Sequence, residues 1–154
     1  MEKLMIDSGI REYQINDNGV LRFNPSDPNV YARFIEVMDK IQSVEKKLIA
    51  KAKELEKAES QEGNGTAVLK IMAEADRDIK RLLMEVFGPG NDFDKLLGGV
   101  NLLAVAGNGE RVITNFLTAM QPIMIEGAES CAKQQADKAV AEANVRRAQS
   151  GARR

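Results

Sequence analysis

The chain of 154 residues lacks histidine and tryptophan, and it has a single cysteine, Cys131. Histidine is the commonest general base and metal ligand, so its absence excludes catalytic triads that depend on it. One cysteine cannot form an internal disulfide. The alanine-rich surroundings of Cys131 predict a small packing residue rather than a reactive thiol.

Long apolar runs and a strong net charge are also missing. No run approaches the ~20 residues of a transmembrane helix, and the acidic residues around the short apolar stretch near Met1 do not resemble a secretory signal. The formal net charge of -1 gives no general attraction to nucleic acid or anionic lipid. The hydrophobic fraction of 44% and the charged fraction of 29% are those of an ordinary globular domain. These features predict a single-domain cytoplasmic protein that does not enter a membrane.

Three glycine-containing segments resemble binding motifs but lack essential positions. Residues 16–19 (Asn-Asp-Asn-Gly) suggest a calcium loop, but its first and last ligand positions would be Gln14 and Pro25. Residues 88–90 and 107–109 lack the third glycine of a dinucleotide fingerprint and the ending of a phosphate loop. We interpret all three segments as turns.

The charged residues are explained without a catalytic or metal site. Helix capping and surface charge account for the closely spaced aspartates, Asp76, Asp78, Asp92 and Asp94. A solubilising tail accounts for the net-basic end better than a nucleic-acid site does, because no aromatic residue there could stack on bases. That end contains Arg146, Arg147, Arg153 and Arg154. The sequence therefore predicts a protein that is not an enzyme and has no cofactor or metal.

Residues 10–24 predict a β-hairpin, because apolar and polar residues alternate on both sides of a turn at Gly19. A three-residue loop with Gly19 in a left-handed conformation would place the four apolar side chains on one face. That register pairs Ile15 with Leu21 and Tyr13 with Phe23. The helices that follow are expected to cover this face.

Two long helices are predicted next, packed as an antiparallel pair. Asp27 can cap the first helix and Pro28 suits its first position, and the helix is expected to run to about Ser60. Its apolar stripe comprises Val30, Phe34, Val37, Met38, Ile41, Val44, Leu48, Ala52 and Leu55. A turn at residues 63–65 and a cap at Thr66 begin the second helix. Its inner face comprises Leu69, Met72, Ile79, Leu82, Leu83, Val86 and Phe87.

Glycine-rich turns then precede a short helix and a long final one. Gly88, Pro89 and Gly90 are expected to end the second helix and turn the chain. A short helix around Phe93, Leu96 and Leu97 is capped by Asn91 or Asp92, and Leu102, Leu103 and Val105 form an apolar connector. Asn108 and Gly109 open the last helix, which Pro122 should bend and Gly127 should weaken. We expect one domain over residues 1–127 and an alanine-rich helical extension with a basic, frayed end over residues 128–154.

The turn segments 87–93 and 97–101, the helix pattern of residues 112–125, the strand-forming beginning and the long charged helix together resemble a known family. The chain is similar, over roughly residues 8–126, to the small tail assembly chaperones of long-tailed bacteriophages and prophages of Gram-positive bacteria. The resemblance implies a partner, the long and aggregation-prone tape measure protein, which such chaperones keep soluble while tail tube subunits polymerise around it. It implies the host cytoplasm as the location.

The last helix has the broadest apolar face, and we assign partner binding to it. An amphipathic helix of the partner would lie in a groove formed there. The residues proposed are Val112, Phe116, Met120, Ile123 and Met124. Filling of the core explains the methionines better than partner binding does, although flexible thioethers also suit varied apolar partners. Self-association stays open, as do two other functions: a structural tail or connector subunit, and a small phage regulator that binds nucleic acid.

Overall fold

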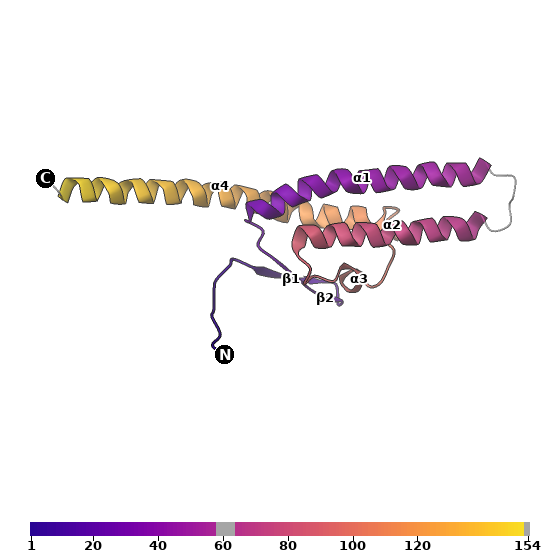
Figure 1. The fold of residues 1–154 in the computed structure, drawn as a ribbon, viewed down its shortest axis with the longest axis horizontal. Helices are drawn as coiled ribbons and strands as arrows, with labels where there is room; N and C mark the ends of the chain where they lie inside the picture. Colours follow the sequence, from indigo (N-terminus) through magenta and orange to yellow (C-terminus); the bar gives the residue numbers. More distant parts are fainter. Residues whose placement is uncertain (58–63, 153–154) are drawn as a thin grey trace.

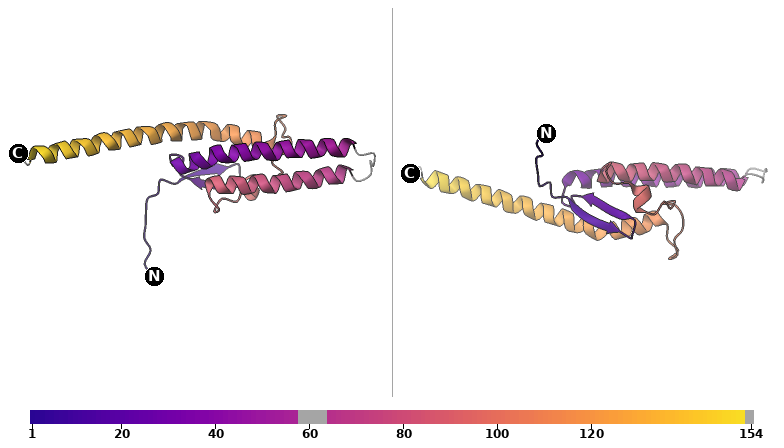
Figure 2. Two further views of the ribbon diagram at one scale, coloured as in Figure 1. Left: turned by 45° about the horizontal axis from the view of Figure 1, so that its top comes forward. Right: turned by 90° about the horizontal axis from the view of Figure 1, so that it is seen from below.

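The computed structural model describes residues 1–57 and 64–152, and it is mainly helical with an N-terminal β-hairpin, as the sequence predicts. The elements are β1 (Arg11–Ile15), β2 (Gly19–Phe23), α1 (Pro28–Lys57), α2 (Asn64–Phe87), α3 (Phe93–Leu96) and α4 (Val112–Ala152). Helices α1 and α2 lie side by side as the predicted antiparallel pair (Figure 1). The first part of α4 packs beside them, and its C-terminal part projects away from the other elements (Figures 1 and 2).

The hairpin forms where predicted, but the predicted register is wrong by two residues. Tyr13 pairs with Leu21, and Ile15 pairs with Gly19. Gly19 has a positive φ of 152°, but it belongs to β2 rather than to the loop, and Asn16 supplies the turn with a φ of 47°. Because the shift is an even number of residues, the predicted apolar face is preserved. The two β2 residues of this apolar face, Leu21 and Phe23, are 0% and 3% exposed.

Helix α1 begins as expected. The amide of Asn29 donates to the Asp27 carboxylate at 2.9 Å, which is the predicted N-terminal cap, and Pro28 is the first helical residue. Its buried stripe comprises Val30, Val37, Ile41 and Leu48. The predicted helix end at Ser60 and the glycine of the next turn, Gly63, lie outside the described residues.

Helix α2 differs from the prediction at its start. It begins at Asn64, so Thr66 lies inside the helix and is not its cap. Leu69 is 67% exposed, although we expected it on the inner face. Six and ten residues separate Leu69 from the buried Ala75 and Ile79, and at ~100° per residue it points about a quarter to a third of a turn away from them.

The glycine turn after α2 is confirmed. Helix α2 ends at Phe87, and Gly88 follows with a φ of 109°, which a residue with a side chain rarely adopts. Asp92, one of the two predicted caps, caps α3 by accepting a hydrogen bond from the Lys95 amide at 3.2 Å. The connector after α3 then buries Leu102 and Leu103, whereas Val105 is exposed.

The last helix begins at Val112, so the prediction that Asn108 and Gly109 open it is wrong. Gly109 has a φ of 83°, which an α-helix does not allow, and a β-bridge joins Val105 to Arg111 across this turn. Helix α4 then continues through Pro122 without interruption and curves along its length (Figure 2).

The core contains four phenylalanines from four different segments. Phe87 of α2 packs edge-on against Phe23 of β2, with ring centroids 4.9 Å apart. Phe116 of α4 contacts both Phe87 and Phe93 at 6.1 and 5.7 Å. The hairpin, α2, α3 and α4 therefore share one core, which fixes the position of α4 relative to the hairpin.

Candidate partner-binding grooves

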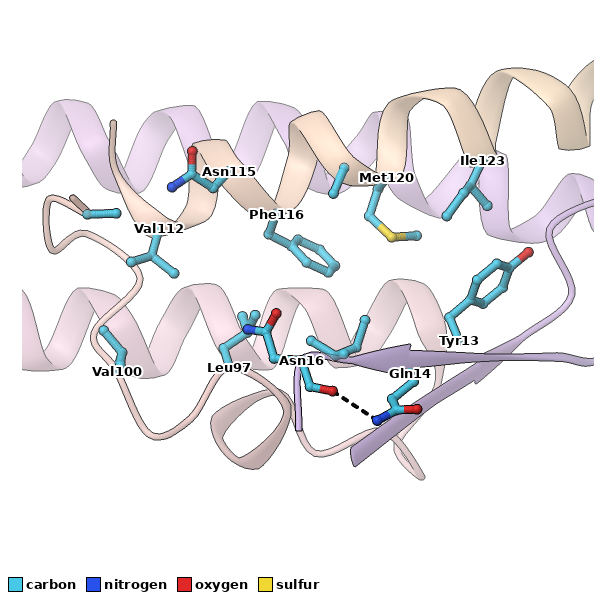
Figure 3. A pocket seen from close by; sticks show the side chains of 13 residues that line it. Tyr13, Gln14, Asn16, Leu97, Val100, Val112, Asn115, Phe116, Met120 and Ile123 are labelled. Atoms are coloured by element: carbon cyan, nitrogen blue, oxygen red, sulfur yellow. Dashed lines mark hydrogen bonds between the residues drawn. The ribbon is translucent and has the colours of Figure 1, made fainter. Parts of the chain in front are cut away.

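The first part of α4 separates two apolar hollows. The first, which we call the hairpin groove, lies between β1, the connector after α3, and α4, and has a volume of about 540 Å³ (Figure 3). Phe116 and Met120 point from α4 toward the hairpin, and Tyr13 reaches up toward Ile123 (Figure 3). The groove is lined by Tyr13, Gln14, Ile15, Asn16, Leu97, Val100, Ala106, Val112, Asn115, Phe116, Ala119, Met120 and Ile123.

The second hollow, which we call the helix groove, lies between α1 and α4 and has a volume of about 440 Å³. Two isoleucines in it are strongly exposed: Ile35 at 64% and Ile125 at 49%. Its lining comprises Tyr31, Phe34, Ile35, Met38, Thr114, Leu117, Thr118, Gln121, Met124 and Ile125. Burial raises the pKa of the Tyr31 phenol; a hydrogen bond to the backbone of Ala128 opposes this shift and the charge of Glu129 adds to it.

The predicted partner face is divided between these two grooves. Val112, Phe116, Met120 and Ile123 line the hairpin groove, whereas Met124 lines the helix groove. Phe116, Met120 and Met124 are only 6%, 3% and 4% exposed, so most of their surface belongs to the core. Among the residues that line the two grooves, Ile35 and Ile125 are the most exposed large apolar ones, and neither was predicted as part of a site. In the sequence, the sign that these two isoleucines would be exposed is that each lies outside the main apolar stripe of its helix.

The turn of Gly88, Pro89 and Gly90 positions the side chain of Asn91, which the sequence predicted only as a possible helix cap. Asn91 is 5% exposed, and its carboxamide pairs with the backbone of Arg22 on β2. The Asn91 oxygen accepts from the Arg22 amide at 2.9 Å, and its nitrogen donates to the Arg22 carbonyl at 2.9 Å and to the Phe87 carbonyl at 2.8 Å. Asn91 therefore covers the outer edge of β2 and connects it to the end of α2.

The buried Lys80 of α2 binds α3 and the connector that follows it. The Lys80 ammonium donates to Asp76 at 2.8 Å, to Asp94 at 2.6 Å and to the Val100 carbonyl at 3.1 Å. The second oxygen of Asp76 accepts from the Leu102 amide at 2.7 Å. Burial opposes the lysine charge, but the hydrogen bonds and charges of the two aspartates outweigh it and raise the Lys80 pKa above its ordinary value. All three ammonium donors are used within the fold, so we assign this cluster a structural role.

Cys131 is half-buried on α4. Within residues 1–57 and 64–152, no group of three histidine, cysteine, aspartate or glutamate side chains could hold a metal ion. No helix in the same part of the chain is both long and apolar enough to cross a membrane.

Comparison with protein-family models, with curated proteins and with solved structures finds no match to this chain.

Proposed function

We propose that this chain is a tail assembly chaperone of a long-tailed bacteriophage or prophage, acting in the cytoplasm of the bacterial host. It binds amphipathic helices of the tape measure protein, keeps that protein soluble, and assists the polymerisation of tail tube subunits around it. It carries out no catalysis and uses no cofactor. The observation that supports this proposal most is the helix groove, where α1 and α4 leave exposed isoleucines beside an apolar hollow.

The position of the helix groove between two helices suits a helical partner. Ile35 on α1 and Ile125 on α4 belong to separate helices, and a third helix laid between two others buries apolar residues on both. Met38 and Met124 lie in the same groove, and their flexible thioethers can adapt to the varied apolar side chains of a long helical partner.

Co-expression with a phage tape measure protein tests the proposal. The wild-type chain should keep that protein in the soluble fraction and co-purify with it. Ile35→Asp should abolish co-purification, because a carboxylate in the groove loses water on binding without gaining a partner. Since the Ile35 side chain is already 64% exposed, the variant should keep the circular dichroism spectrum and melting temperature of the wild type.

Ile49→Asp is the matched control. Ile49 also lies on α1 and is 46% exposed, but it does not line the helix groove. It should co-purify as the wild type does. Met124→Gln is less suitable because Met124 is 4% exposed, and its substitution changes the core as well as the groove.

Two results would favour other functions. Stable rings or tubes formed by the purified chain, with no association with the tape measure protein, would favour a structural tail or connector subunit. Salt-dependent association with nucleic acid would favour a small regulator. Equal binding by wild type and Ile35→Asp would place the tape measure site outside the helix groove.

A further inference from the structure

The first residues of the chain carry apolar side chains that the rest of the molecule does not cover. Leu4, Met5 and Ile6 are 80%, 82% and 80% exposed. Residues 1–7, which we call the arm, have no regular secondary structure and extend away from the helices (Figures 1 and 2). Three consecutive large apolar residues in water form a surface that binding would bury favourably.

The hairpin has one covered edge and one open edge. On β2 the outward-facing amide and carbonyl of Arg22 are bound by Asn91. The backbone amide and carbonyl of Arg22 point away from β1, so those of its pairing partner Glu12 point away from β2. Because this direction alternates along a strand, the backbone groups of Gln14, two residues further along β1, point the same way as those of Glu12. Among the described residues, no hydrogen-bond partner meets the backbone groups of Glu12 and Gln14 on that outer edge. The edge of β1 therefore offers a row of free donors and acceptors.

The open edge adjoins the hairpin groove. Tyr13 and Ile15 of β1 line that groove, and so do Ala119 and Ile123 of α4. A strand added beside β1 would gain backbone hydrogen bonds from Glu12 and Gln14, and alternate side chains of that strand would enter the groove.

We propose that the hairpin groove receives the arm of a second copy of this chain, which adds to the edge of β1 as an antiparallel third strand. Leu4 and Ile6 enter the groove beside Tyr13, and Met5 faces solvent. The exchange is reciprocal, so that each copy gives its arm to the other around a two-fold axis. The apolar arm and the open edge are thereby covered by the same contact.

The arm's attachment favours a second copy over the chain's own groove. Ser8 is held beyond the end of β2, because its carbonyl accepts a hydrogen bond from the Asn24 side chain at 3.0 Å. Gly9 lies so close to Asn24 that an added Cβ would be 2.7 Å from the carboxamide nitrogen. An arm that paired with its own β1 would need a tight turn at residues 8–10, and the contacts of Ser8 and Gly9 with Asn24 hold that segment in place instead.

Aspartate substitutions along the arm test the proposal by their alternation. In sedimentation equilibrium the wild-type chain should dimerise, and Leu4→Asp or Ile6→Asp should raise the dimer dissociation constant roughly tenfold or more, because each places a charge in an apolar groove. Met5→Asp is the matched control, with the same added charge on the solvent face, and should change the constant less than threefold by that reasoning. All three positions are exposed in the single chain, so far-ultraviolet circular dichroism should not change.

Gln14→Pro tests the strand edge directly. It removes an outward amide that has no partner within one chain, so it should block dimerisation while preserving the fold. In a mixture of ¹³C-labelled and unlabelled chains, filtered nuclear Overhauser contacts should join the methyl groups of Leu4 and Ile6 to the Tyr13 ring of another copy.

Three results would overturn this proposal: a monomer at all concentrations, equal effects of all three arm substitutions, or arm contacts that occur only within one chain. None of these results bears on tape measure binding at Ile35, which the co-expression experiment measures separately.

Discussion

At Gly127, helix α4 passes close to the backbone of Pro25, in the segment between the hairpin and α1. A Cβ at this position would overlap the carbonyl oxygen of Pro25 and lie 2.6 Å from its carbonyl carbon, whereas ordinary contact begins at 3.4 Å. Gly127→Ala should therefore force α4 and the connector apart. Because the obstacle is backbone on both sides, no change of side-chain rotamer can relieve the overlap.

Two opposing effects set the expected magnitude. Alanine favours the helix over glycine by roughly 0.5–1 kcal/mol, and overpacking a close contact typically costs about 1–3 kcal/mol and occasionally more. Since the displaced connector also holds the end of β2 and the start of α1, we expect the upper part of that range to apply. The net loss in the free energy of unfolding should be about 2 kcal/mol, which for this chain length lowers the melting temperature by about 4–8 °C.

Urea unfolding followed by circular dichroism measures this loss, and an unchanged m-value would show that the unfolding transition is otherwise the same. Gly151→Ala is the control on the same helix, where an added Cβ would meet no atom within 4 Å. It should leave stability within about 0.5 kcal/mol of the wild type. A Gly127→Ala variant as stable as the wild type would refute the reasoning, because it would show that the helix and the connector separate without cost.

Three further predictions concern stability. Asn91→Ala should cost about 2–4 kcal/mol in urea unfolding, because it leaves the Arg22 amide and neighbouring carbonyls without partners; a loss below 1 kcal/mol would contradict it. Lys80→Met should cost about 3–5 kcal/mol near neutral pH by leaving Asp76 buried without its cation. Folding raises the Lys80 pKa, so the charged lysine contributes its full stabilisation at pH values below the ordinary lysine pKa. The wild type loses that stabilisation as the pH rises through the raised pKa of the folded state, whereas the Lys80→Met variant should show no such loss of stability at alkaline pH. Deleting residues 146–154 should leave the melting temperature nearly unchanged in calorimetry, because the described residues of this end are exposed, and a large decrease would show that the end packs.

Local signals predicted the elements well. Each of these signals depends only on residues close by in the sequence. Asp27 caps α1 by accepting a hydrogen bond from an amide two residues later, and Pro28 and Gly88 act through their own backbone dihedral angles. The alternation in the hairpin likewise predicted the correct face. The register failed because the turn used Asn16 for its positive φ, and the apolar pattern is unchanged by a shift of two residues.

The candidate site was less predictable because it depends on where separate elements meet. The hydrophobic pattern of α4 identified an apolar face, but it could not show that Phe116 would pack on Phe87 and Phe93 and so belong to the core. The exposure of Ile35 and Ile125 depends on the gap between α1 and α4, which a pattern within either helix does not define. Similarly, nothing near Asn91 in the sequence indicates that its carboxamide reaches Arg22, 69 residues earlier.

Helix α4 joins the aromatic core to the far end of the molecule through one continuous rod. From Gly127 to Ala152 it advances 25 residues, or about 38 Å at ~1.5 Å per residue. The close approach of Gly127 to Pro25 lies at the base of this length. A tilt of ~10° there would carry the tip through about 6–7 Å, given that rise per residue. A fluorescent label on the C-terminal part of α4 would therefore report any tilt of the helix at Gly127 as a displacement larger than the one at the core.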